Sequence, residues 1–101
     1  MIAKKYLSEN YDCTGYLSRY EKGYYQEDAC IQLILPCSEA YINNDDNRLV
    51  IGRPGVDGIE FCYRLHQSGI WAFYPIDGEF VKKAETIDGL IQGWLDGSIV
   101  V

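Results

Sequence analysis

The segment "IEFCYRLHQSGIWAFYPIDGEFVK", residues 59–82, decides the fold class because apolar and polar residues alternate along it. From residue 59 to residue 66 every second side chain is apolar, and a period of two puts the two sets on opposite faces of a strand. A turn at residues 67–69 leads to a second strand at residues 70–74. The pattern therefore predicts neighbouring antiparallel strands.

The next turn signal is the dipeptide Asp77-Gly78. It is typical of a two-residue hairpin of type I′, whose two central residues both need a positive φ. A third strand then runs from Glu79 to Lys82. Together these features predict a three-stranded antiparallel meander over residues 57–83.

An amphipathic helix is predicted over residues 86–96, directly after the meander. Thr86 is a suitable N-cap, Asp88 lies in the first turn, and Gly97 can end the helix in a left-handed conformation. A helix this short needs tertiary support, so its apolar stripe is expected to pack on one face of the sheet. The tail at residues 98–101 is expected to add an edge strand or to dock on the core. The stripe consists of Ile87, Leu90, Ile91, Trp94 and Leu95.

The first half of the chain gives weaker signals. Residues 29–35 are apolar apart from Gln32 and predict a buried strand. Two further strands are expected on either side of the loop "NNDDN", residues 43–47. This loop also places Asn or Asp at alternate positions, as calcium loops do, but it lacks the glycine and glutamate that an EF-hand needs, so the turn is favoured. A short helix is expected within residues 14–22. We expect a single α+β domain over residues 1–101, with residues 1–27 the least regular part.

Composition and charge narrow the range of functions. The chain has 101 residues and a net charge of −6, which argues against a nucleic-acid-binding surface and is compatible with a basic protein partner. The N-terminus lacks the apolar segment of a signal peptide, and no stretch is long and apolar enough for a membrane span. We therefore expect a cytoplasmic protein that does not act at a membrane, with its four cysteines reduced.

The sequence offers little support for catalysis. There is no C-x-x-C pair and the single histidine is not spaced as a zinc ligand, so neither a metal nor another cofactor is expected. Cys62 and His66 share a strand face but are about 13 Å apart along it, beyond hydrogen-bond reach. Another cysteine could approach His66 through folding, which leaves a thiol enzyme open. The segment at residues 52–55 matches no phosphate-binding motif and is interpreted as a turn.

The candidate binding residues are carboxylates and aromatic side chains of the loops and strands. Acidic turns are usually only solvated, but turns gathered at one end of the sheet would form an anionic patch suited to a basic protein. Trp71 is either exposed on an uncovered face as an interface anchor or packed in the core against Trp94; in the second case Ile70, Ala72 and Tyr74 form the outer face. The candidates are Asp45, Asp46, Asp57, Glu60, Trp71, Tyr74, Asp77 and Glu79.

From residue 49 onward the order of features resembles the SUKH superfamily, which contains bacterial immunity proteins and yeast cell-wall-synthesis regulators. The resemblance covers about half of the chain and is carried by "LVIGRPGVDGIEFCYR" (49–64), "GIWAFYP" (69–75) and "AETIDGLIQGWLDG" (84–97). It implies a non-enzymatic α+β protein that binds and neutralises a toxin domain, with no catalytic residues to carry over. Two alternatives stay open: a small enzyme or ligand-binding domain with a thiol or carboxylate site, and a structural subunit that self-associates through a β-edge or its aromatic face.

Overall fold

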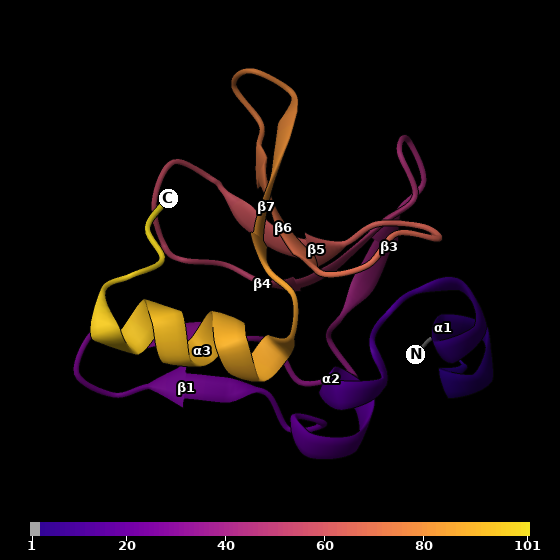
Figure 1. Ribbon diagram of the computed structural model, residues 1–101, viewed down its shortest axis with the longest axis horizontal. Helices are drawn as coiled ribbons and strands as arrows, with labels where there is room; N and C mark the ends of the chain where they lie inside the picture. The colour runs from indigo at the N-terminus through magenta and orange to yellow at the C-terminus, as the bar shows by residue number, and fades with distance from the viewer. Residues whose placement is uncertain (1–2) are drawn as a thin grey trace.

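The computed structural model describes residues 3–101, whose strands form one antiparallel sheet. The strand order is β1-β2-β4-β5-β6-β7, and β3 pairs with β4 on the side where β2 also pairs (Figure 1). With the C-terminal helix this is an α+β arrangement, which confirms the predicted fold class. The strands are β1 (Tyr24–Gln26), β2 (Ile31–Ile34), β3 (Tyr41–Asn43), β4 (Arg48–Gly52), β5 (Glu60–Tyr63), β6 (Ile70–Tyr74) and β7 (Glu79–Ala84).

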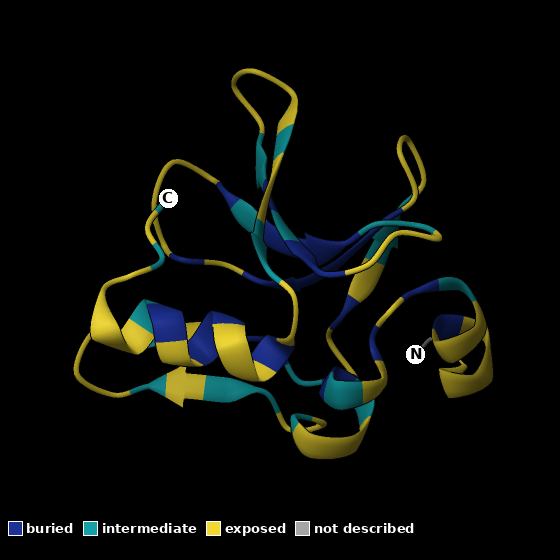
Figure 2. Cartoon of the chain, in the orientation of Figure 1, coloured by how far each residue is buried: buried dark blue, intermediate teal, exposed yellow. Residues whose placement is uncertain are grey.

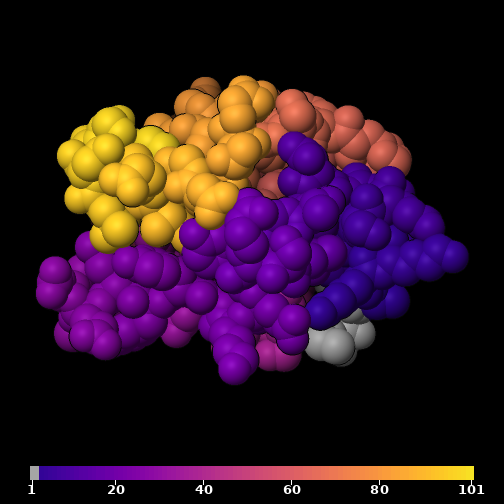
Figure 3. Space-filling model, turned by 60° about the horizontal axis from the view of Figure 1, so that its bottom comes forward, coloured from indigo at the N-terminus to yellow at the C-terminus, as the bar shows by residue number. Residues whose placement is uncertain are grey.

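The helices lie on one face of the sheet, which we call the inner face. Leu7, Tyr16 and Leu90, one from each helix, belong to a core cluster that also contains Phe61 and Ala72 of the sheet. Figure 3 shows this side of the molecule, with the C-terminal helix next to the N-terminal third of the chain. The opposite face, which no helix of residues 3–101 covers, is called the outer face. The helices are α1 (Lys4–Asn10), α2 (Thr14–Arg19) and α3 (Ile87–Asp96).

The meander follows the predicted alternation. Cys62 pairs with Trp71 across β5 and β6, and this pair lies on the outer face, whereas the neighbouring pair of Phe61 and Ala72 is buried in the core. The alternative in which Trp71 packs against Trp94 is wrong, because the strand period assigns Trp71 to the opposite face. The ring that Trp94 meets is that of Phe61, edge to face at a centroid distance of 6.1 Å.

The hairpin between β6 and β7 differs from the predicted two-residue turn. Tyr74 pairs with Glu79, so the loop has four residues, 75–78, and only Gly78 among them has a positive φ, of 68°. The Gly78 amide donates to the Tyr74 carbonyl at 2.8 Å and closes the loop. Pro75 has no amide hydrogen for the strand ladder, so pairing stops before it and the loop is longer than the Asp-Gly signal suggests.

Helix α3 confirms the predicted helix and its caps. The Thr86 hydroxyl accepts a hydrogen bond from the Gly89 amide at 3.0 Å, and Gly97 ends the helix with a φ of 81°. The tail forms no strand; instead its residues Ile99 and Val101 dock against the core cluster. Four residues of the apolar stripe pack on the inner face as expected, whereas the fifth, Leu95, is 48% exposed.

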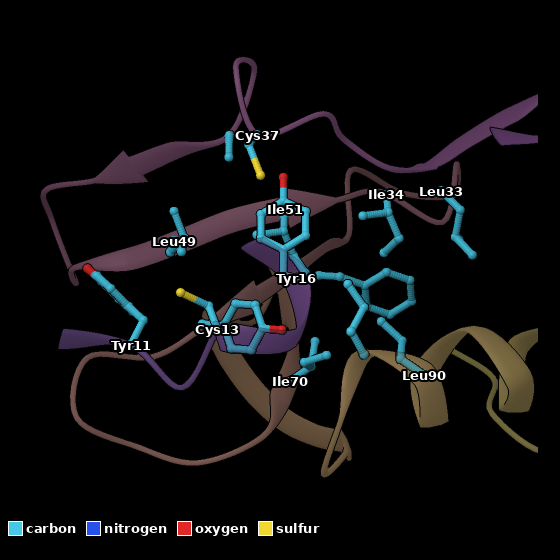
Figure 4. Close-up of a cluster of buried hydrophobic side chains, with 14 of the residues drawn as sticks. Tyr11, Cys13, Tyr16, Leu33, Ile34, Cys37, Leu49, Ile51, Ile70 and Leu90 are labelled. Carbon is cyan, nitrogen blue, oxygen red and sulfur yellow. The ribbon is translucent and has the colours of Figure 1, made fainter. Parts of the chain in front are cut away.

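The tyrosine-rich N-terminal segment contributes to the core. The predicted short helix within residues 14–22 is α2, which ends at Arg19, while α1 was not predicted. Tyr16 is fully buried and its hydroxyl donates to the Leu35 carbonyl at 2.5 Å (Figure 4). Tyr11 is also buried and donates to the Asn47 carbonyl at 2.7 Å. These side chains attach the segment to the sheet, because each buries a ring and satisfies a distant backbone carbonyl.

Candidate functional site

Three of the predicted binding residues meet at one end of the sheet. Asp57 lies in the β4–β5 loop, Asp77 in the β6–β7 loop, and Tyr74 at the end of β6; together they line a hollow of about 220 Å³. Strands β4 to β7 alternate in direction, so these two loops emerge at the same end of the sheet. We call this place the acidic hollow; its remaining lining residues are Ile59, Pro75, Ile76 and Val101.

Local backbone geometry positions the β4–β5 loop. Asp57 and Gly58 both have positive φ values, 52° and 69°, and the Ile59 amide donates to the Val56 carbonyl at 3.0 Å. Aspartate tolerates the left-handed conformation better than most residues, and glycine adopts it without strain. The chain therefore turns sharply before β5 and leaves the Asp57 side chain exposed at the rim.

The carboxylates of the acidic hollow have no cationic partner. Among residues 3–101, neither Asp57 nor Asp77 forms an ion pair, and neither does Glu79, which lies next to the hollow because it pairs with Tyr74. All three are exposed. The Lys83 ammonium reaches only the Tyr74 ring, 5.8 Å from its centroid. This end of the sheet consequently presents three exposed carboxylates without an ion-pair partner among the described residues.

Exposed apolar side chains accompany this charge. Ile76 at the tip of the β6–β7 loop is 84% exposed, and Val56 in the β4–β5 loop is 44% exposed (Figure 2). An apolar centre with a charged rim is typical of protein interfaces. The hollow is smaller than the roughly 300–1,000 Å³ of most ligand pockets, so its size favours contact with a protein side chain over enclosure of a small molecule.

Two other predicted carboxylates are held in an internal network instead. Arg48, whose side chain is 11% exposed, donates to Asp46 at 2.6 Å and to Glu60 at 3.0 Å. Glu60 also accepts from the Tyr41 hydroxyl at 2.7 Å, and the guanidinium lies 3.9 Å from the centre of the Phe73 ring. We call this set the arginine network. Its two carboxylates already have partners and cannot provide free charge.

The remaining predicted residue of the β3–β4 loop, Asp45, lies at the opposite end of β4 from the acidic hollow. The Asp45 amide donates to the Asn43 side chain at 3.0 Å, which stabilises the turn. Its carboxylate is exposed. The loop interpretation is confirmed for residues 44–47, which connect β3 and β4, whereas Asn43 is the last residue of β3. The predicted carboxylates are therefore divided between two regions and do not form one patch.

Trp71 lies on the outer face beside a cation that the sequence analysis missed. The Arg64 guanidinium is 4.0 Å from the Phe80 ring centre and 5.0 Å from that of Trp71. The Trp71 indole nitrogen donates to the Ser68 carbonyl at 3.1 Å, and the side chain is only partly exposed. The period-two alternation of the strands is sufficient to assign Arg48 and Arg64 to the outer face. The sequence contains no signal for the aromatic rings that each guanidinium contacts.

The buried thiols are poorly suited to nucleophilic chemistry. Burial raises the pKa of Cys62 to about 12, and its thiol contacts the Trp71 carbonyl at 3.6 Å, while His66 is exposed. Burial also raises the pKa of Cys13, to about 11. Since the thiolate is the nucleophile, both groups are almost entirely unreactive at neutral pH.

Cys37 lines a second hollow of about 350 Å³ beside α1, together with Lys4 and Glu21. Those two side chains form an ion pair of 3.0 Å. Burial raises the pKa of the Cys37 thiol as well, which works against an activated cysteine at this position.

No family model, curated protein or solved structure matches this chain. Within residues 3–101, no three His, Cys, Asp or Glu side chains gather closely enough to hold a metal ion. No helix in the same range has the length and apolar character needed to cross a bilayer.

Proposed function

We propose that this protein is a non-enzymatic, cytoplasmic binding module whose acidic hollow docks onto a basic surface of a protein partner. The observation that carries the proposal is the meeting of Asp57 and Asp77, without cationic partners, around an apolar centre formed by Tyr74 and Ile76. Asp46 and Glu60, which the sequence could not distinguish from these residues, are engaged by Arg48 and fall outside the proposed surface.

The class of partner follows from the chemistry of the hollow. Uncompensated carboxylates at a rim attract and orient a basic protein, and a partly exposed tyrosine beside an isoleucine gives an anchor that excludes water. The resemblance of residues 49–97 to SUKH immunity proteins suggests that this partner is a toxin domain. Binding would then neutralise the toxin by covering its basic, functional surface.

Affinity capture from the native host tests the binding surface. The bait is the wild-type protein, the double variant D57K/D77K, or the matched control D45K, which reverses an exposed charge in another loop. We expect the wild type and D45K to retain the same basic protein at low salt, with less at moderate salt, and D57K/D77K to lose it. Bound proteins are identified by mass spectrometry.

The identified partner then allows a test of neutralisation. Its gene is expressed in a laboratory bacterium alone, with the wild-type protein, and with D57K/D77K. Growth arrest that only the wild type relieves would support an immunity role. Capture of no protein, or only of acidic proteins, contradicts the proposed surface, and a partner that is harmless when expressed alone contradicts the immunity role.

A further inference from the structure

Strand β7 (Glu79–Ala84) ends the sheet, and its free edge is the longest one available for pairing. It has six residues, whereas β1 at the opposite end has three. Within residues 3–101 no other strand pairs with the outward side of β7. An unpaired row of amides and carbonyls can accept a further strand, which is why many proteins protect such edges.

The sequence of this edge is complementary to itself. Reading "EFVKK" from Glu79 to Lys83 against a second copy in the opposite direction places Glu79 opposite Lys83 at both ends and Val81 opposite Val81 in the middle. Phe80 then lies opposite Lys82. The opposite charges of Glu79 and Lys83 favour pairing, whereas the Lys82 ammonium is already bound by Glu85 at 2.8 Å.

The structure places the paired side chains on matching faces. Val81 pairs with Ala72 and Glu79 with Tyr74, on the inner face, and Lys83 joins them because its ammonium lies over the Tyr74 ring. The pairing of β7 with β6 is regular from Glu79 to Lys82, and its register shifts by one residue after Lys82. Residues 79–82 therefore form a regular edge, and the long Lys83 side chain can reach Glu79 of a second copy.

Other symmetric registers are less favourable. Centring the pair on Lys82 sets Lys82 against Lys82 and Glu79 against Glu85, which are like charges. Centring it on Phe80 leaves only residues 79–81 overlapping within the strand and leaves both lysines beyond that overlap. Only the register centred on Val81 overlaps five residues of the strand without opposing like charges.

We propose that β7 pairs with β7 of a second copy of this chain, antiparallel and centred on Val81, to form a two-fold symmetric dimer with one continuous sheet. The contact is a single pair of short strands, far smaller than a standard interface, so the dimer is weak and depends on concentration. Asp57 and Asp77 lie in loops outside this strand. Glu79 lies next to the acidic hollow, so the two proposals share one border residue. Sedimentation measures the dimer and affinity capture with D57K/D77K measures the partner surface, so either proposal can fail without the other.

Sedimentation velocity of the purified protein, from roughly 1 µM to 1 mM, measures the monomer–dimer equilibrium. We expect the wild type to dimerise as concentration rises. E79K opposes Lys83 with lysine, and K83E opposes Glu79 with glutamate, so each variant alone should weaken dimerisation at least tenfold. An equimolar mixture of the two restores opposite charges at both ends and should form a heterodimer.

The restored mixture separates strand pairing from damage to the fold. K22E and E39K, which reverse exposed charges on other segments, serve as controls and should dimerise as the wild type does. V81K places two lysines at the symmetry centre and gives an independent loss of the dimer. A monomeric wild type at every concentration, a dimer that survives in E79K and K83E, or a mixture that stays monomeric although both variants are folded would overturn the proposal.

Discussion

The arginine network and the acidic hollow contain the same kinds of residues but hold them in opposite states. In the network, the Glu60 side chain is 14% exposed and receives hydrogen bonds from Arg48 and Tyr41. In the hollow, Asp57 and Asp77 are exposed and have no ion-pair partner within the described residues. A carboxylate that is enclosed by donors stabilises the fold, whereas one that faces solvent beside apolar side chains remains available for binding.

An acidic composition therefore does not tell which carboxylates stabilise the fold and which are available for binding. Removing a partner from an enclosed carboxylate leaves a charge poorly solvated, so the network is expected to be sensitive to mutation. Removing an exposed, unpaired carboxylate changes little in the fold. The two regions should therefore separate cleanly into effects on stability and effects on binding.

The largest expected effect concerns Cys62, which lies on the outer face between the rings and arginines of that side. Its raised pKa of about 12, against an ordinary value of 9.0, corresponds to roughly a thousand-fold less thiolate at pH 8. With iodoacetamide, followed by peptide mass mapping, we expect exposed Cys30 to be alkylated first and Cys62 only on unfolding. Rapid alkylation of Cys62 in the folded protein would contradict its burial on the outer face.

The next largest effect is the loss of folding stability on replacing Arg48. Replacing it with methionine keeps much of the apolar stem but leaves Glu60 without its cation, and we expect a loss of about 2–3 kcal/mol, less than for a fully buried pair because both carboxylates retain some exposure. Urea unfolding measures the change. The control is R53M, since Arg53 is exposed and bonds only the Tyr41 hydroxyl; it should cost no more than about 0.5 kcal/mol. Equal losses in both variants would contradict the special role of the network.

A direct comparison of the two regions uses neutral isosteres. E60Q removes a charge that accepts from Arg48 and Tyr41, and we expect it to destabilise the fold by about 1–2 kcal/mol. D77N should change stability by less than about 0.5 kcal/mol, because Asp77 is exposed and forms no ion pair. Both are measured by chemical denaturation. If D77N proves as destabilising as E60Q, the hollow also has a structural role.

The smallest expected effect is a change in how folding stability depends on pH, and it concerns the paired carboxylate of Asp88. The Tyr20 hydroxyl and the Arg19 guanidinium hold the pKa of Asp88 below its ordinary value. A lowered folded-state pKa gives stability that is present above the unfolded-state pKa, about 3.9, and is lost as pH falls through the folded-state value.

We therefore expect D88N to lose less stability than the wild type on acidification below about pH 4. Thermal melts at a series of pH values record the difference. Identical acid profiles for D88N and the wild type would show that the Asp88 contacts do not persist in solution.

Much of the meander and of α3 could be predicted because the signals are local. Alternation over residues 59–66 assigned side chains to faces, and Thr86 and Gly97 marked the ends of a helix. The four-residue loop after Tyr74 was missed because Pro75 interrupts the strand ladder before the Asp-Gly dipeptide. Helix α1 was missed because a seven-residue helix shows too few turns of periodicity to be recognised.

The sequence by itself determined the strands of the meander, the alternation of their side chains between two faces, and the chain's excess of negative charge. Only the tertiary structure decided which carboxylates are neutralised. Arg48 reaches Glu60 across twelve residues of sequence, and Asp57 meets Asp77 only because two loops emerge at the same end of an antiparallel sheet. Charge pairing depends on distance in space, and strand pairing, which sets those distances, is a long-range property of the chain.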